Sequence, residues 1–398
     1  MAITVPINSG DHFDFIVVGG GTAGNTVAGR LAENPNVRIL IVEAGVANPE
    51  QLNEVMTPSN AMNLRGSKHD WAYKTTIVKR DDYERIEKPN TRGKILGGSS
   101  SLNYFTWIPG CKPTFDMWAE YGGEEWTWDP LVPYLRKSVT YHDDEGLYDK
   151  SLAKIGGGGP VNISHAELLP EMAPFRDALT KAWVSMGEPL TENIYDGEMI
   201  GLYHCADTIY KGRRQGSFLF LKNKPNITVV TEAMSKKLLI DYASRTCSGV
   251  TVVLGNGQEM SFYADREVIL SQGVYESPKL LMLSGIGPAR ELAKFNIECI
   301  VDSRHVGQNL IDHPAVPFVL KVKDDFGMDN TILRKNELNA QVHAAYAKDH
   351  SGPVGSGFLE MVGFPPHRQV PRHGPRLQRG RQGQRRQGSA VPRRPASL

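Results

Sequence analysis

Two apolar runs near the N-terminus enclose a segment with helical spacing. Residues 15–18 read Phe-Ile-Val-Val and residues 39–42 read Ile-Leu-Ile-Val, the pattern of strands that are buried on both faces. Between them, apolar residues at positions 27, 28, 31 and 32 recur at helical spacing, and a polar sequence around Pro35 ends the helix. The pattern therefore predicts a β-α-β unit of a parallel sheet.

A second group of apolar runs begins after residue 226. Residues 227–230, 238–240 and 249–253 are rich in Ile, Leu and Val, and the sequence Gly-Asn-Gly at 255–257 predicts a hairpin. Residues 268–270 predict a further buried strand. We expect this strand to lie beside the first β-α-β unit.

Three more helices are expected from capping residues and helical spacing. Residues 130–138 follow Asp129, residues 174–187 carry an apolar face, and residues 278–283 follow Ser277. Helices that alternate with buried strands indicate an α/β fold.

Residues 212–216 read Gly-Arg-Arg-Gln-Gly and are expected to form a basic turn that enters a helix at residues 218–221. Arginines in such a turn are usually solvated at the surface, and this is the expectation here. The alternative is that they contact the phosphates of a ligand.

The composition changes abruptly at Pro365. Residues 365–398 contain no Asp, Glu or Lys and are rich in Arg, Pro, Gln and Gly. A segment without apolar periodicity cannot bury enough surface to fold, so a disordered basic tail is expected. One interpretation is a tail that binds nucleic acid. The sudden change favours the other, a segment outside the designed fold, as after a frame change.

The whole chain has the composition of a globular protein. It is 40% hydrophobic and 22% charged with a net charge of +1, which gives no reason to expect nucleic acid or a membrane as partner. Its N-terminus lacks the features of a secretory signal, so a cytoplasmic location is expected. Four scattered cysteines predict neither a metal site nor a disulfide framework.

The turn after the first apolar run carries the first candidate chemistry. Residues 19–24 read Gly-Gly-Gly-Thr-Ala-Gly and satisfy the dinucleotide pattern G-x-G-x-x-G. Gly19 permits the tight turn, Gly21 lets the backbone approach a pyrophosphate, and Gly24 lets helix and strand pack closely. Glu43, at the end of the second run, can accept hydrogen bonds from a ribose. Strand, loop, helix, strand and acid in this order predict dinucleotide binding.

A second glycine cluster lies at 97–103, where the sequence reads Gly-Gly-Ser-Ser-Ser-Leu-Asn. Its amides and hydroxyls can donate hydrogen bonds to phosphate or ring oxygens, which makes it a second candidate anion cradle. An ordinary Gly/Ser loop is the equally weighted alternative.

Together these motifs resemble the glucose–methanol–choline (GMC) family of FAD-dependent oxidoreductases. The β-α-β unit with Glu43 resembles the family's FAD fingerprint, residues 93–116 its first signature and residues 273–287 its second. The turn at 306–314 is also similar to a family element, so the resemblance covers about residues 12–364.

The resemblance implies an α/β fold with a Rossmann-like FAD-binding domain and a second, incomplete α+β substrate domain. Residues 12–110 and 226–310 would form the FAD-binding domain. Residues 111–225 and 311–364 would form the substrate domain.

The resemblance also implies which residues bind FAD. The ADP part would contact the first glycine turn, the flavin would be lined by residues 103–106, and the adenine would lie against the backbone near Ser235. The expected cofactor-binding residues are Gly19, Gly21, Thr22, Ala23, Gly24, Glu43, Ala44, Gly97, Gly98, Ser99, Asn103, Tyr104, Phe105, Thr106 and Ser235. Because residues 97–106 contain no histidine that could bind flavin covalently, noncovalent FAD is expected.

The activity implied is oxidation of a small-molecule alcohol by hydride transfer to flavin, followed by reoxidation by an electron acceptor. The family's catalytic histidine belongs to a C-terminal motif, and His343, His350, His367 and His373 lack its surrounding residues. No catalytic residue is assigned, and we expect a C-terminally shortened form. Two alternatives are a non-catalytic FAD-binding remnant and an NAD-dependent dehydrogenase, although the second leaves residues 97–106 unexplained.

Overall fold

The computed structural model describes residues 7–76, 87–166, 170–313, 315–319, 321, 334 and 336–366. The α-helices in these ranges are α1 (Thr22–Leu31), α2 (Asn53–Met56), α3 (Lys112–Asp116), α4 (Ala119–Gly122), α5 (Trp128–Arg136), α6 (Ala173–Ser185), α7 (Gly273–Leu283), α8 (Ala289–Ala293) and α9 (Glu337–Asp349). The strands are β1 (His12–Val18), β2 (Ile39–Val42), β3 (Tyr73–Thr76), β4 (Glu87–Asn90), β5 (Val139–His142), β6 (Val161–His165), β7 (Gly201–His204), β8 (Ala206–Asp207), β9 (Ile209–Tyr210), β10 (Arg213–Arg214), β11 (Ile227–Val230), β12 (Ala233–Asp241), β13 (Thr246–Leu254), β14 (Glu259–Leu270), β15 (Ile286–Gly287), β16 (Val301–Asp302) and β17 (Met361–Phe364). Two 3₁₀ helices, η3 (Gly98–Ser101) and η7 (Ser217–Leu221), contact α1.

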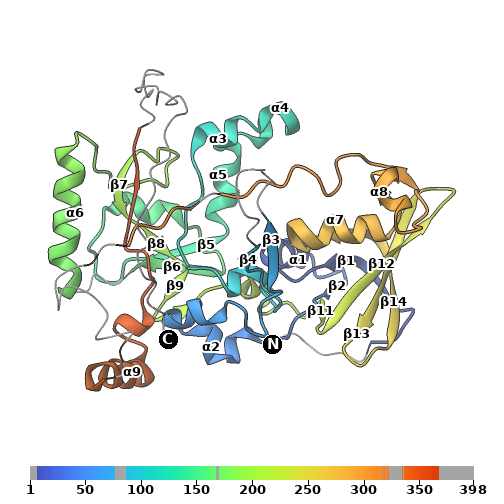
Figure 1. Cartoon of the computed structure of the whole chain (residues 1–398), viewed down its shortest axis with the longest axis horizontal. Coiled ribbons are helices and arrows are strands. Elements are labelled where there is room, and N and C mark those ends of the chain that lie inside the picture. Colours follow the sequence, from blue (N-terminus) through green and yellow to red (C-terminus); the bar gives the residue numbers. More distant parts are fainter. Residues whose placement is uncertain are drawn as a thin grey trace, which may run out of the picture. The chain divides into compact units, whose positions relative to one another are not determined.

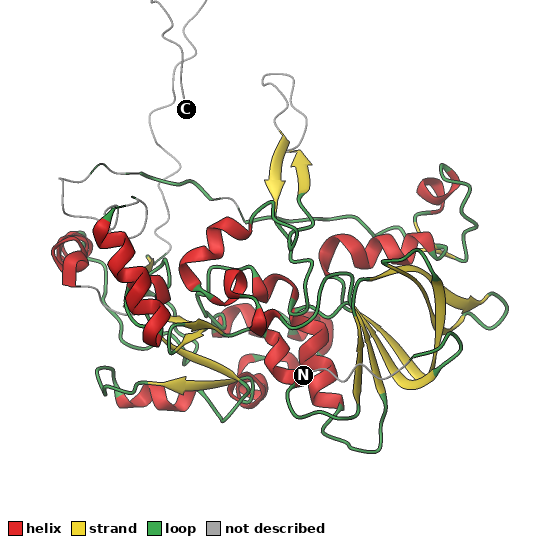
Figure 2. Ribbon diagram, turned by 90° about the horizontal axis from the view of Figure 1, so that it is seen from below, coloured by secondary structure: helices red, strands yellow, loops and turns green. Residues whose placement is uncertain are grey.

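A six-stranded sheet contains the predicted β-α-β unit (Figure 1). Its strand order is β11-β2-β1-β14-β13-β12, in which β11, β2 and β1 run parallel to one another and to the end of β14. β12 and β13 extend it as an antiparallel meander, and the hairpin predicted at 255–257 joins β13 to β14. Figure 2 shows the twist of these strands. The predicted placement of 268–270 beside the first unit is confirmed, although these residues are the end of the longer β14.

Both faces of the parallel strands are buried, as their unbroken apolar runs predict. Val17 and Ile41 pack with α1 and η7 on one face. Ile16 and Leu40 pack on the other face, where α7 contributes Leu280. The sheet thus holds the first turn of α1 and the first turn of α7 at its carboxyl edge.

Two expected helix boundaries are wrong. α5 begins at Trp128 with Thr127 as its N-cap, so Asp129 lies inside the first turn instead of capping it. α7 begins at Gly273 and continues through Pro278, which was expected to be its first residue. The reason is Gly273, whose φ of +83° lets the helix begin directly after β14, while Ser277 Oγ accepts a hydrogen bond from Gln272 N.

A second, smaller sheet orders β5-β6-β8, and β7 pairs with β17. Residues from these strands share a core with Phe220 of η7, so the two parts are packed together. Residues 1–365 group into one unit and residues 366–398 into another, and the domain division at the expected bounds stays a prediction. The expected tail lies outside the described residues from position 367 onward.

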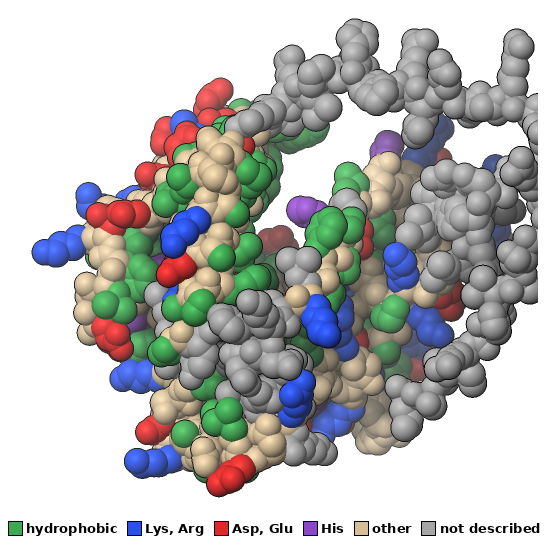
Figure 3. All heavy atoms as spheres, turned by 60° about the vertical axis from the view of Figure 1, so that its left-hand side comes forward, with side chains coloured by type: hydrophobic (Ala, Val, Ile, Leu, Met, Phe, Trp, Pro, Cys, Tyr) green, Lys and Arg blue, Asp and Glu red, His purple; other side chains and the backbone are tan. Residues whose placement is uncertain are grey.

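On the face drawn in Figure 3, acidic, basic and apolar side chains are interspersed. Within the described ranges, no helix combines the length and the hydropathy needed to cross a bilayer. The same ranges contain no group of three or more His, Cys, Asp or Glu side chains arranged to hold a metal ion.

Candidate cofactor-binding site

The three glycines of the β1–α1 turn meet different surroundings. A Cβ on Gly19, whose φ is +102°, would lie 2.7 Å from Ser271 O, and one on Gly24 would lie 2.0 Å from Gly19 O. A Cβ on Gly21 would meet no chain atom closer than 3.8 Å. Gly19 and Gly24 are therefore required by the turn and by packing, whereas Gly21 leaves open space in front of the backbone.

The second glycine cluster packs directly against this turn. Gly97 N donates a hydrogen bond to Gly20 O at 2.7 Å. A Cβ on Gly98 would lie 2.7 Å from the Cα of Gly21, so only glycine allows this approach. Both glycines of the pair have positive φ, +97° and +52°. Two motifs about 75 residues apart in the sequence thus form one continuous backbone surface.

The N-terminus of α1 faces this surface and is open to an anion. No side chain caps the ten-residue helix, and its first turn contains no acidic residue. Free N–H groups and the positive end of the helix dipole therefore remain available, as phosphate binding requires.

Glu43 ends β2 beside the same turn and is 6% exposed. Its carboxylate accepts hydrogen bonds from Gly20 N at 2.9 Å and Gly45 N at 2.8 Å. Burial raises the pKa of Glu43 to about 7, although the backbone N–H groups act in the opposite direction. Each oxygen keeps a lone pair that can accept a ribose hydroxyl.

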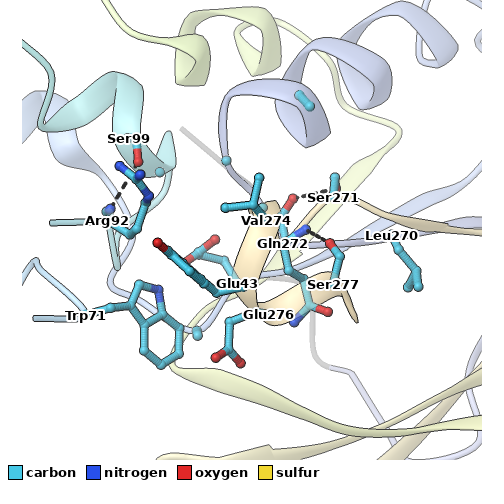
Figure 4. Close-up of a pocket in the computed structure, with 18 of the residues that line it drawn as sticks. Glu43, Trp71, Arg92, Ser99, Leu270, Ser271, Gln272, Val274, Glu276 and Ser277 are labelled. Atoms are coloured by element: carbon cyan, nitrogen blue, oxygen red, sulfur yellow. Dashed lines mark hydrogen bonds between the residues drawn. The ribbon is translucent and has the colours of Figure 1, made fainter. Parts of the chain in front are cut away.

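The first turn of α7 forms the opposite wall (Figure 4). Gln272 Nε2 donates to Ser235 Oγ at 2.7 Å. Its Oε1 is buried and has no hydrogen-bond partner among the described residues, so it can accept a hydrogen bond from a ligand. Ser235, expected near adenine, therefore reaches the pocket together with Gln272.

Aromatic and charged side chains complete the rim. The rings of Trp71 and Tyr73 stack with centroids 5.7 Å apart. Tyr73 Oη donates to Glu276 Oε1 at 2.5 Å, and burial together with this carboxylate raises the pKa of Tyr73. Figure 4 shows Trp71 and Arg92 beside the pocket, with Glu276 drawn near Trp71. Sequence reasoning missed these residues, for which the alternating aromatic pair at 71 and 73 was the available signal.

The resulting pocket has a volume of about 500 Å³. It is lined by nine of the expected residues, Gly19, Gly21, Thr22, Ala23, Glu43, Ala44, Gly98, Ser99 and Ser235. Gly24 and Gly97 support these from behind, as their tight contacts show. Open amides for phosphates, a carboxylate for ribose and an unpartnered amide oxygen fit the adenosine diphosphate half of a dinucleotide.

Asn103, Tyr104, Phe105 and Thr106 do not line this pocket but form the loop that follows η3. Their expected role beside a flavin stays a prediction. Arg214, in contrast, was expected at the surface and is fully buried beneath this loop. The surface expectation is wrong because backbone carbonyls, which no sequence pattern displays, accept its hydrogen bonds.

Comparisons with known proteins agree with this geometry. A model of the GMC oxidoreductase family matches residues 13–315. An oxygen-dependent choline dehydrogenase of Burkholderia multivorans is 36% identical over 360 residues, which are 89% of this chain and 61% of that protein. The structure of a formate oxidase variant from Aspergillus oryzae RIB40 is similar with 72% identity and a TM-score of 0.88, over 90% of this chain and 62% of that one. An FAD-dependent oxidoreductase from Chaetomium thermophilum is 25% identical with a TM-score of 0.76, over 88% of this chain and 61% of that one.

The chain thus spans 61% or 62% of the length of these relatives. The α/β fold with an FAD-binding sheet, predicted from the resemblance, is confirmed by structural neighbours of the same family. Because the family model matches well over half of its residues, the chain belongs to the GMC oxidoreductase family.

Proposed function

We propose that this chain binds FAD and belongs to an enzyme that removes a hydride from a small organic donor. The observation that carries the proposal is the contact between the two glycine turns, next to Glu43 and the open N-terminus of α1. GMC oxidoreductases bind FAD, and the pocket has the groups that its ADP half needs.

In this proposal the backbone of Gly21 and the first turn of α1 bind the pyrophosphate, and Glu43 binds the ribose. Ser235 and Gln272 lie at the adenine end, and residues 103–106 lie at the flavin end. When bound, FAD supplies a hydride acceptor. The absence of histidine from residues 97–106 supports noncovalent binding to this segment.

Formate is the donor that the comparisons favour. The identity of 72% to a formate oxidase is twice the 36% found for the choline dehydrogenase. Removal of hydride from formate leaves carbon dioxide, whereas an alcohol must also lose its hydroxyl proton to a base. Both relatives have names that indicate oxygen as the electron acceptor, and we propose oxygen here. A choline-like alcohol is the second candidate.

The test is a visible spectrum of the purified, desalted chain before and after adding formate or choline under nitrogen. Bleaching of the flavin bands by formate supports the whole proposal. Bleaching by choline but not by formate indicates that the donor is a choline-like alcohol. Bands that neither donor changes indicate an FAD-binding chain without this activity. Failure to retain or take up FAD refutes the proposal. Acid precipitation then shows whether the flavin is released, as noncovalent binding requires.

A further inference from the structure

Arg214 is a buried cation that forms no ion pair with a carboxylate of the described residues. Its side chain is fully buried, at the end of the two-residue strand β10. Other described arginines do form ion pairs with carboxylates, among them Arg30, Arg176 and Arg266. Burial lowers the pKa of Arg214 to about 9, which still leaves it charged at neutral pH. A charge in such a place is unfavourable unless other groups compensate for it.

The guanidinium bonds to three separate segments. Nε donates to Val55 O of α2 at 2.9 Å. Nη1 donates to Asn103 O at 3.0 Å, to Asn103 Oδ1 at 2.7 Å and to Ser100 O at 3.3 Å. Its centre lies 4.1 Å from the centroid of the Phe105 ring, close enough for a cation–π interaction. Arg214 therefore holds the end of η3 and the following loop against α2.

The loop that it holds is strained. Phe105 has a φ of +72°, a left-handed conformation that is unfavourable for an aromatic residue. Phe105 O accepts hydrogen bonds from Thr208 N at 2.8 Å and Thr208 Oγ1 at 3.0 Å. Contacts from Arg214 on one side and Thr208 on the other thus maintain a conformation that the loop would not adopt alone.

Several buried polar atoms at this place have no hydrogen-bond partner among the described residues. They are Arg214 Nη2, Thr106 Oγ1 and both carboxylate oxygens of Asp207, which pairs with Thr106 in an isolated β-bridge. Buried groups of this kind are rare in native structures and point to a partner outside the chain's own contacts. The loop continues directly from Gly98 and Ser99, which line the cofactor pocket. A ligand that extends from this pocket along η3 would reach the loop.

We propose that Arg214 is a positioning residue for the flavin end of the cofactor. It fixes residues 103–106 in their strained conformation and places a positive charge behind them. Such a charge favours the reduced, anionic flavin over the oxidised, neutral one. This inference rests on the proposed FAD function, because it requires the flavin to lie against this loop.

Three variants of the full chain test it. Arg214→Gln removes the charge, Arg214→Lys keeps the charge but loses the planar set of donors, and Arg213→Gln is the matched control. Arg213 is the adjacent, half-buried arginine and bonds to Glu50 O and His350 Nε2, away from the loop. Two quantities are measured: the flavin reduction potential against a reference dye, and hydrogen exchange of the peptide 97–107 before FAD is added.

We expect Arg214→Gln to lose at least tenfold in the preference for reduced over oxidised flavin, a fall of about 30 mV for a two-electron couple. The flavin reduction potential of Arg214→Lys should differ from that of the wild type by less than a third of that fall. Hydrogen exchange of its loop peptide should nevertheless be faster than in the wild type. Arg213→Gln should match the wild type in both measurements. Because lysine preserves the charge, a change in potential caused by misfolding alone would appear in both Arg214 variants.

A wild-type potential in Arg214→Gln overturns the electrostatic role, and unchanged loop exchange in both variants overturns the positioning role. Equal falls in potential for Gln and Lys would also contradict the role of charge. If Arg214→Gln does not fold, the comparison of Arg214→Lys with Arg213→Gln still decides the positioning role. If the wild-type chain binds no FAD, the proposed function fails and the flavin role falls with it, while loop exchange reports separately on the positioning contact.

Discussion

Gly21 and Gly24 belong to one turn, yet the structure predicts opposite consequences for their replacement by alanine. Gly21 has φ −84° and ψ −162°, an extended conformation that alanine adopts without strain. Its added Cβ would make only van der Waals contacts, at 3.8 Å from Gly98 Cα and 3.9 Å from Ser271 O. The Cβ of alanine at Gly24 would overlap Gly19 O at 2.0 Å. Gly21→Ala should therefore affect ligand binding, whereas Gly24→Ala should affect folding.

The magnitudes follow from these contacts. Gly21→Ala replaces the glycine N-cap of α1, which lowers the free energy of unfolding by a few tenths to about 1 kcal/mol. It also reduces the conformational entropy of the unfolded chain, which raises the free energy of unfolding by about 0.4–1 kcal/mol. The free energy of unfolding should thus change by less than about 1 kcal/mol. The methyl group, however, occupies the space through which a phosphate approaches the backbone. Loss of one charge-assisted hydrogen bond costs about 1.5–3 kcal/mol, so FAD affinity should fall roughly ten- to hundredfold. Gly24→Ala should lower stability by about 3 kcal/mol or more.

Urea denaturation without FAD measures stability, and flavin fluorescence titration measures affinity. Gly21→Ala should have the wild-type urea midpoint and weak binding, whereas Gly24→Ala should unfold at much lower urea. Gly66→Ala is a useful control. Gly66 has a positive φ and does not line the pocket, and a Cβ added to it would contact no other atom. Wild-type FAD affinity in Gly21→Ala would refute the placement of the pyrophosphate at this turn.

Three further predictions concern polar side chains that are buried or half-buried. Glu43→Gln should lower the free energy of unfolding by about 1–3 kcal/mol in urea and weaken FAD binding, because an amide has one acceptor oxygen for two N–H donors; an unchanged urea midpoint would contradict this. Tyr73→Phe should cost about 1.5–3 kcal/mol in the same assay, since it removes the hydrogen bond to Glu276, and full stability would show that this bond contributes nothing. Asp207 is fully buried, and burial raises its pKa to about 8. The folded chain therefore binds the proton of this carboxyl group more tightly than the unfolded chain does, and the free energy of unfolding should fall as pH rises from about 4 to 8. Asp207→Asn should flatten that fall in thermal melts between pH 5 and 8, and identical slopes in both proteins would disprove the assignment.

The sheet and the glycine turn were predictable because their information is local. Both faces of residues 15–18 and 39–42 are covered, and an unbroken apolar run expresses that burial within four residues. The dinucleotide turn likewise needs only adjacent residues to specify its glycines. The contact of Gly98 with Gly21 was not predicted, because no local rule joins two glycine clusters so far apart; the resemblance to a family only assigned both clusters to the same cofactor.

The rest of the site depends on contacts between distant segments. Trp71 and Glu276 face the same pocket only because the segment that leads into β3 lies near the first turn of α7. The start of α7 was placed five residues too late, at Pro278 instead of Gly273, so Gln272 and the residues after it were not connected with the pocket. A serine and a proline suggested a local cap, but the conformation of Gly273, set by the end of β14, decided the boundary.

Arg214 shows why charge in a sequence is a poor guide to burial. A buried carboxylate or ammonium group usually needs a partner of opposite charge, and sequence reasoning searches for that partner. A guanidinium has five N–H donors, which backbone carbonyls can satisfy, and every residue carries such a carbonyl. Three of the acceptors of Arg214 are the backbone carbonyls of Val55, Ser100 and Asn103, which side-chain types do not reveal, and the fourth is the side-chain oxygen of Asn103. Two adjacent arginines therefore have different environments, which their sequence does not distinguish. Because of this difference, Arg213→Gln is the control that separates the general effect of removing a positive charge from the effect of removing the charge of Arg214.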